Sequence, residues 1–247
     1  WRTCPFPDSG HYSGHPRARR TFDMIWLFLI VGAYLLGSIP FGVVIAKSRG
    51  VDIRECGSGN IGATNVGRVL GKRLGLLCFV LDLGKGAAPV LVAGSWYGIL
   101  DEWATEIPAR TSWLWLAVGV APLVGHMASV FLRFRGGKGV ATAFGALLAM
   151  WPTLGIPAVI AFAAWLLVVG ISRIVSLASM MAAVTVPIAT ILLLLTAPVP
   201  ESVAATEMAA RMAPPIIVSI AIASLVLWRH RANLRRLLSG DEPRVGQ

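Results

Sequence analysis

The sequence contains little charge and little cysteine. Only 14% of its 247 residues are charged, compared with about 25% in an average soluble domain, and 56% are hydrophobic. The three cysteines, Cys4, Cys56 and Cys78, lack metal-ligand spacing and predict neither a disulfide framework nor a zinc site. These shortages exclude a separate soluble catalytic domain and indicate an integral membrane protein. Any chemistry must therefore lie on helix ends and loops.

The charge that is present is mostly positive. Lys and Arg together number 22 and Asp and Glu 12, which gives a formal net charge of +10. This excess favours anionic partners, such as a lipid bilayer or phosphorylated substrates. Nucleic acid is not an expected partner, because the basic residues are scattered among loops between apolar runs.

Apolar runs predict seven membrane helices. A bilayer-spanning helix needs about 20 apolar residues. The stretch 140–170 is too long for one helix and is interrupted at Trp151-Pro152, so it predicts a short helix followed by a longer one. The expected helices cover residues 24–46, 74–100, 113–132, 140–150, 153–170, 174–196 and 215–228. The fold class is therefore an all-α membrane protein, a bundle of seven transmembrane helices over residues 24–239 with a C-terminal tail at 240–247.

Loop charges predict the orientation of this bundle. Basic residues dominate the loops at 47–73, 133–138 and 229–236, whereas the loops at 101–110 and 201–211 contain more acidic than basic residues. The positive-inside rule places the basic loops in the cytoplasm, with the N-terminus outside and the C-terminus inside. Residues 1–23 disagree, because they include four arginines, and we expect them to be a poorly ordered extension upstream of a natural start at Met24.

The first candidate site is the polar loop GSGNIGATNVGR at residues 57–68, between two apolar runs. Glycines let backbone N–H groups approach an anion closely, and an arginine can bind phosphate through two hydrogen bonds. The candidate residues of this loop are Gly57, Ser58, Gly59, Asn60, Gly62, Thr64, Asn65 and Arg68. A flexible polar loop without a ligand is the alternative interpretation.

A second glycine-rich segment, RGGKG at residues 135–139, stands immediately before a predicted helix. A helix N-terminus presents free N–H groups and a partial positive charge, so glycines and a lysine there favour phosphate binding. Its candidate residues are Gly136, Gly137, Lys138 and Gly139. The spacing is not that of a Walker A motif, so ATP is not implied. The alternative is a basic turn that only follows the positive-inside rule.

Five further polar residues lie within or beside apolar runs. Asp82 and Lys85, spaced i and i+3, share a helix face and either pair structurally or contact a substrate. His126 either packs in the bundle or contributes to the site. His230 and Asn233 share a face of the C-terminal helix, which is either an anchor on acidic lipid or part of a site for transfer chemistry on phosphate esters.

Together these segments resemble the bacterial acyl-phosphate:glycerol-3-phosphate acyltransferases, the PlsY family. The resemblance rests on GSIPFG at 37–42, the loop at 57–68, LD and KG within 81–86, GH at 125–126, FRGGKGVAT at 134–142, and HR with Asn233 at 230–233. Each motif is weak alone, whereas their combination in family order is specific. Ala128, at a position where we expect an aromatic residue, and the long outer loop at 197–212 depart from the pattern.

The resemblance implies a multi-pass protein of the bacterial cytoplasmic (inner) membrane, with its active site facing the cytoplasm. It implies transfer of a fatty acyl group from acyl phosphate to the sn-1 hydroxyl of glycerol 3-phosphate, giving lysophosphatidic acid and inorganic phosphate without a metal or other cofactor. The catalytic residues by this analogy are Ser58, Arg68, Lys138, His230 and Asn233, and the other candidates bind substrate. His230 acts either as a general base or as a positioning group, and the resemblance leaves the acyl-chain preference and oligomeric state open.

A membrane transporter of a phosphorylated solute is the competing hypothesis, because broken helices with glycine-rich ends also form binding sites at the membrane midplane. The polar segments are predicted on one face of the membrane, and no inverted repeat is evident, which favours the enzyme. A purely structural scaffold leaves both glycine-rich loops unexplained.

Overall fold

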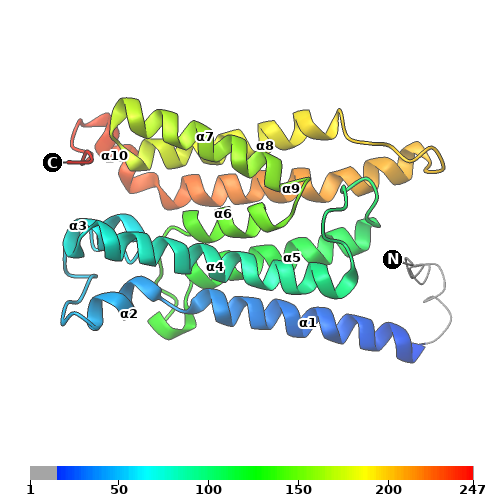
Figure 1. The fold of residues 1–247 in the computed structure, drawn as a ribbon, viewed down its shortest axis with the longest axis horizontal. Coiled ribbons are helices and arrows are strands. Elements are labelled where there is room, and N and C mark those ends of the chain that lie inside the picture. Colours follow the sequence, from blue (N-terminus) through cyan, green and yellow to red (C-terminus); the bar gives the residue numbers. More distant parts are fainter. Residues whose placement is uncertain (1–15, 247) are drawn as a thin grey trace.

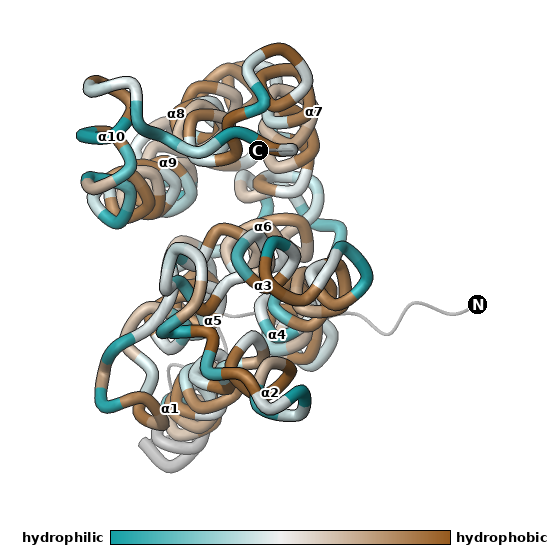
Figure 2. Tube along the Cα trace, turned by 90° about the vertical axis from the view of Figure 1, so that its left-hand side faces the viewer, coloured by the Kyte–Doolittle hydropathy of each residue, from teal (hydrophilic) through white to brown (hydrophobic). Residues whose placement is uncertain are grey.

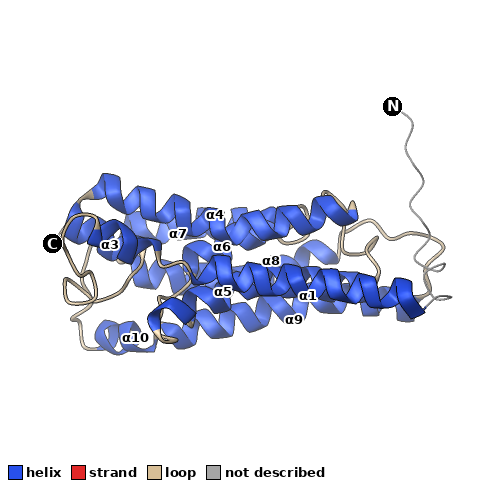
Figure 3. Cartoon of the chain, turned by 90° about the horizontal axis from the view of Figure 1, so that it is seen from below, coloured by secondary structure: helices blue, strands red, loops and turns tan. Residues whose placement is uncertain are grey.

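The structure is a computed structural model, and it describes residues 16–246 as a bundle of helices (Figure 1). The long helices are α1 (Pro16–Ser38), α4 (Lys72–Tyr97), α5 (Ala109–Met127), α7 (Gly155–Ser172), α8 (Val175–Leu194) and α9 (Ala205–Arg229). The short ones are α2 (Phe41–Lys47), α3 (Ala63–Leu70), the 3-10 turn η2 (Val130–Leu132), α6 (Val140–Ala149) and α10 (Arg231–Leu238). Figure 3 shows no strand in this part of the chain, so the all-α prediction is confirmed.

Within residues 16–246, six segments are long and apolar enough to cross a membrane, one fewer than the sequence predicted. The difference is α6, which has 10 residues. At 1.5 Å per residue it is about 15 Å long, half of a hydrocarbon core of about 30 Å. The expected short helix is therefore present, and it packs against α4 and α5 without reaching spanning length. α1 begins at one end of the bundle and α10 lies at the other (Figure 1).

Several predicted helix boundaries were wrong. α9 begins at Ala205, within the segment expected to be a long outer loop, because Glu207 and Arg211 form an i,i+4 ion pair and Met208 is buried against neighbouring residues. α1 begins at Pro16, eight residues before the helix start expected at residue 24, and so includes residues 16–23 of the predicted N-terminal extension. Residues 1–15, the rest of that predicted extension, lie outside the described residues.

The helices pack in two groups. α1, α4, α5 and α6 contact one another on one side, and α8 packs between α7 and α9 on the other. Contacts of α5 with α9 and of α6 with α7 join the groups. Large apolar side chains such as Phe28, Leu167 and Ile171 are exposed on the outside of the bundle, as expected for lipid-facing positions. Figure 2 views one end of the bundle, where hydrophilic loops and α10 face the viewer and mostly hydrophobic helices extend behind them.

Candidate active site

The first glycine-rich loop is folded around the side chain of Asn65, which is buried in α3. The Asn65 Oδ1 atom accepts a hydrogen bond from the backbone N–H of Ser58 at 2.8 Å. Its Nδ2 atom donates to the carbonyl oxygens of Ile53, Cys56 and Asn60 at 3.3, 3.0 and 2.9 Å. One amide therefore satisfies four backbone groups of the loop and fixes its shape.

The other candidates of this loop either shape the backbone or face solvent. Gly57 and Gly59 have φ angles of +60° and +67°, in the left-handed region that glycine adopts without strain. The Asn60 Oδ1 atom accepts a hydrogen bond from the Gly62 N–H at 2.9 Å. Gly57 and Gly59 are exposed, and so are the side-chain candidates Ser58, Thr64 and Arg68. Donors in this loop are thus available to a ligand at the end of the bundle.

The second glycine-rich loop is held by residues from distant helices. The Arg229 guanidinium, at the end of α9, donates from Nη2 to the carbonyl oxygens of Gly136 and Gly137 at 2.7 and 2.8 Å. The Gly137 N–H donates to the His126 carbonyl oxygen at 3.1 Å, and a Cβ atom at Gly137 would overlap the His126 imidazole ring. Gly139, with φ +77°, is the residue immediately before α6. α5 and α9 therefore set the position of Lys138.

Asp82, Lys85 and His126 contact one another inside the bundle. Lys85 Nζ lies 2.7 Å from Asp82 Oδ1, and the two side chains are 1% and 3% exposed. His126 Nδ1 lies 3.5 Å from the same oxygen. Lys85 also donates to the Ile39 carbonyl oxygen at 2.8 Å, at the break between α1 and α2. This geometry favours the structural alternative for Asp82 and Lys85, which tie α4 to α5 and to the α1–α2 break.

Lys138 and Asn233 meet although 95 residues separate them along the chain. Lys138 Nζ donates to Asn233 Oδ1 at 2.5 Å, and Asn233 Nδ2 donates to Glu242 Oε1 at 2.5 Å. Glu242 also accepts hydrogen bonds from Ser176 Oγ and Arg236 Nε. The sequence had indicated Lys138 and Asn233 but not Glu242, Ser176 or Arg236, which occupy no recognisable motif.

His230 lies at the joint between α9 and α10, so the predicted continuous C-terminal helix is interrupted there. The buried ring places Nδ1 2.8 Å from the Val226 carbonyl oxygen. Since a carbonyl can only accept, Nδ1 donates and the lone pair of Nε2 remains available. Burial, together with the nearby charge of Lys138, lowers the pKa of His230 to about 4, so the ring is neutral near pH 7.

Lys138 has a lower pKa than an ordinary lysine side chain. Burial lowers its pKa to about 8, the charge of Glu242 opposes this shift, and the charges of three arginines add to it. Those arginines are Arg236, Arg229 and Arg68. Arg68 thus acts on Lys138 electrostatically, although within residues 16–246 no recorded hydrogen bond or ion pair joins Arg68 or Ser58 to Lys138, His230 or Asn233.

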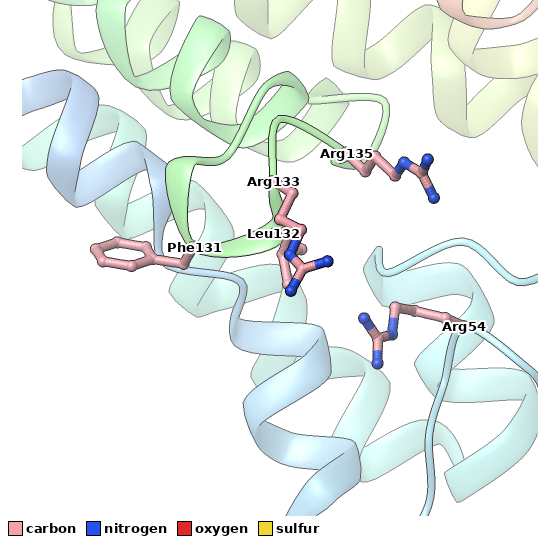
Figure 4. A pocket seen from close by; sticks show the side chains of 5 residues that line it. All are labelled: Arg54, Phe131, Leu132, Arg133 and Arg135. Carbon is pink, nitrogen blue, oxygen red and sulfur yellow. The ribbon is translucent and has the colours of Figure 1, made fainter.

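An open pocket of about 430 Å³ beside the loops is lined by Arg54, Arg133 and Arg135 together with Phe131 and Leu132 (Figure 4). A neighbouring pocket of about 510 Å³ shares several of these residues and reaches both glycine-rich loops through Gly59 and Gly136. Arg54 also pairs with Asp52 at 2.5 Å, and its hydrogen bonds hold the pKa of that carboxyl below its usual range. The sequence had identified Arg54 and Arg133 only as basic loop charges, and Arg135 as the first residue of the second glycine-rich segment.

Fold and site define an integral membrane protein whose two basic, glycine-rich loops converge near one end of a helical bundle. Residues 27–240 match the family described as glycerol-3-phosphate acyltransferase. The chain belongs to that family and is an acyltransferase, which favours the enzyme over the transporter hypothesis.

Individual relatives agree with this assignment. The glycerol-3-phosphate acyltransferase of Aquifex aeolicus is 44% identical over 218 residues, which cover 88% of this chain and 98% of the relative. Two crystal structures described as PlsY (YgiH), an integral membrane glycerol 3-phosphate acyltransferase, are each 43% identical and cover 90% of this chain. The glycerol 3-phosphate form has a TM-score of 0.72 with 96% of that chain covered, and the lysophosphatidic acid form 0.70 with 95%.

Proposed function

We propose that the protein transfers a fatty acyl group from acyl phosphate to the sn-1 hydroxyl of glycerol 3-phosphate in the bacterial cytoplasmic membrane. The products are lysophosphatidic acid and inorganic phosphate. The observation that carries this proposal is the meeting of Lys138 and Asn233 beside the second glycine-rich loop, in a chain of this family. The forms of the related crystal structures, with glycerol 3-phosphate and with lysophosphatidic acid, support the acceptor and the product.

The proposed reaction needs charge stabilisation more than covalent catalysis. The sn-1 hydroxyl oxygen bonds to the acyl carbon, the bond from that carbon to the phosphate oxygen breaks, and phosphate leaves with the electron pair. Lys138 and Arg68 stabilise the negative charge on the acyl oxygen and the leaving phosphate, while Ser58 and Asn233 donate hydrogen bonds. The hydroxyl proton goes either to Nε2 of the neutral His230 or to a phosphate oxygen.

Two phosphorylated substrates require two anion sites, and the chain offers two loops. The Ser58 loop presents exposed donors from α3 and the turn before it, and the second loop presents Lys138. Both substrates approach from one side of the membrane in this proposal, because the basic loops are expected in the cytoplasm. Cysteines introduced at positions 49 and 106, in a background without native cysteines, test this orientation. Position 49 should react with an impermeant reagent only from the cytoplasm and position 106 only from outside.

The direct test supplies purified protein with palmitoyl phosphate and glycerol 3-phosphate, and measures phosphate release together with lysophosphatidic acid by mass spectrometry. Palmitoyl-coenzyme A and palmitoyl-acyl carrier protein are the comparison donors. We expect product only from palmitoyl phosphate. Acyl transfer from either comparison donor, without transfer from palmitoyl phosphate, would refute the proposed donor while leaving the acyltransferase assignment intact.

A further inference from the structure

Glu242 lies in the segment after α10, yet its side chain is only 6% exposed. The segment folds back on the bundle, because the Asp241 N–H donates to the Arg236 carbonyl oxygen at 2.8 Å and the Val245 N–H donates to the Arg173 carbonyl oxygen at 2.7 Å. These backbone bonds bring the Glu242 side chain under α10 and against the start of α8. A residue of a polar tail is thereby buried next to the proposed site.

Three donors surround the Glu242 carboxylate. Oε1 accepts hydrogen bonds from Asn233 Nδ2 at 2.5 Å and Ser176 Oγ at 2.6 Å, and Oε2 accepts one from Arg236 Nε at 2.8 Å. Burial raises the pKa of Glu242, and these three hydrogen bonds lower it. The lowering is the larger effect, so the pKa lies below its ordinary value. The group is therefore an ionised carboxylate, which can only accept hydrogen bonds.

An accepting carboxylate determines which way the Asn233 amide points. The Asn233 Nδ2 atom must face Glu242, so Oδ1 faces the Lys138 ammonium at 2.5 Å. A rotated amide would place its oxygen against a carboxylate and its NH2 group against an ammonium, and both contacts are repulsive. The position of Lys138 Nζ thus depends on Glu242 through Asn233.

We propose that Glu242 is a positioning residue of the acyl-transfer site, which fixes the amide of Asn233 and through it the ammonium of Lys138. The inference rests on the proposed function and deepens it, since Glu242 acts on two residues placed in that site and contacts no substrate in the mechanism above. It also accounts for a buried acidic residue in a site that otherwise gathers positive charge.

The charges around Lys138 link the inference to a measurable quantity, the pH at which Lys138 loses its proton. Four charged groups act on Lys138: Glu242 of the C-terminal tail, Arg236 of α10, Arg229 of α9 and Arg68 of α3. His230, at the joint between α9 and α10, is near Lys138 as well and is neutral. Among these groups Glu242 is the only negative one. Removing its charge leaves Lys138 among three arginines, so Lys138 must lose its proton at a lower pH than in the native protein.

The experiment compares Glu242→Gln, Glu242→Asp and the control Asp241→Asn. The control removes the neighbouring exposed acid, whose carboxylate accepts a hydrogen bond from Ser239 Oγ. We expect Glu242→Gln to lower kcat/KM for phosphate release about 10- to 100-fold, since a small misplacement of a catalytic group has effects of that order. The alkaline limb of its pH profile should move to lower pH. Glu242→Asp, which keeps the charge, should recover part of the activity, and Asp241→Asn should resemble the native protein.

Repeating the Glu242→Gln change in an Asn233→Ala protein distinguishes a positioning role from a general loss of stability. If Glu242 acts through Asn233, the change Glu242→Gln should cost far less in an Asn233→Ala protein than in the native one, because residues that act as a unit are not additive. An equal loss in both backgrounds would overturn the inference. So would a folded Glu242→Gln protein with native kcat/KM and an unmoved alkaline limb.

A readout that needs no catalysis distinguishes this inference from the proposed function. The rate at which an acetylating reagent modifies Lys138, followed by mass spectrometry across pH, reports the titration of that amine. We expect its midpoint to lie lower in Glu242→Gln than in the native protein. If the native protein transfers no acyl group but this shift is present, the proposed function fails and the coupling of Glu242 to Lys138 holds. An unshifted midpoint overturns the inference, whatever the activity.

Discussion

The two glycine-rich loops are ordered in opposite ways. The loop that contains Ser58 is held by Asn65, which bonds backbone groups only 5 to 12 residues away. The loop that contains Lys138 is held by Arg229, which bonds carbonyl oxygens 92 and 93 residues away, and by the carbonyl of His126. The first loop is therefore a local folding unit, whereas the second exists only when α5 and α9 are packed.

The largest expected effect is the loss of the charge in the second loop. Lys138→Ala should lower kcat/KM for phosphate release about 100- to 1,000-fold, as removal of one group that stabilises a developing anion does. Thermal unfolding should change little, because Arg229 and not the Lys138 ammonium holds this loop on the bundle. The control Lys72→Ala removes an exposed lysine at the start of α4 and should keep native activity. A Lys138→Ala protein with most of its activity would remove the basis of the proposed site.

The next largest effect tests the distant support of the second loop. Arg229→Ala removes the guanidinium that bonds Gly136 and Gly137, and the displaced loop should lower kcat/KM about 100-fold. The rate of proteolysis in the first loop should stay native. Arg231→Ala is the matched control, since Arg231 is exposed and donates to the Trp228 carbonyl oxygen. Faster cleavage of the first loop in Arg229→Ala would show that the two loops are not independent.

A smaller effect is expected from the local support of the first loop. Asn65→Ala removes four hydrogen bonds to that loop, so cleavage within residues 53–60 should accelerate and kcat/KM should fall about 10-fold. The alkaline limb of the pH profile should not move, because the surroundings of Lys138 are intact. Arg73→Ala, at an exposed position in the first turn of α4, is the control. Unchanged proteolysis of the loop in Asn65→Ala would contradict the local account.

The smallest effect is a titration of the native protein. The pKa of Lys138 is lowered to about 8, so its charged form is present below that pH and is lost as the pH rises through it. Activity should therefore fall to half at about pH 8. His230 titrates at about 4 and is neutral on both sides of this transition. A rate that stays constant from pH 7 to 9 would exclude Lys138 as the group that must be charged.

The difference between local and long-range contacts also explains which features could be predicted from the sequence. Apolar runs located every long helix, and the break at Trp151-Pro152 located the short α6. The start of α9 was missed, because an ion pair between Glu207 and Arg211 and the burial of Met208 extend the helix beyond its apolar run. A hydropathy pattern contains no information on ion pairs or tertiary packing, so it cannot predict where such a helix begins.

The features of the candidate site also divide into those that local sequence identifies and those that depend on long-range contacts. Glycines and adjacent donors identified both loops, because their composition is visible locally. Glu242 and the arginine-lined pocket were missed, since their positions depend on contacts between segments that are far apart in the sequence. For Asp82 and Lys85 the sequence left two alternatives, and only burial of both charged ends favours the structural pair.

The bond between Lys138 and Asn233 also has a consequence for synthesis. Asn233 follows Lys138 by 95 residues, and ribosomes add about 5–20 residues per second, so the lysine is made about 5–20 s before its partner. During that interval α6, α7, α8 and α9 are produced, and the Asn233 amide that bonds the ammonium does not yet exist. The nascent chain therefore passes through a period in which Lys138 lacks its Asn233 partner, and the period ends only after α10 is made.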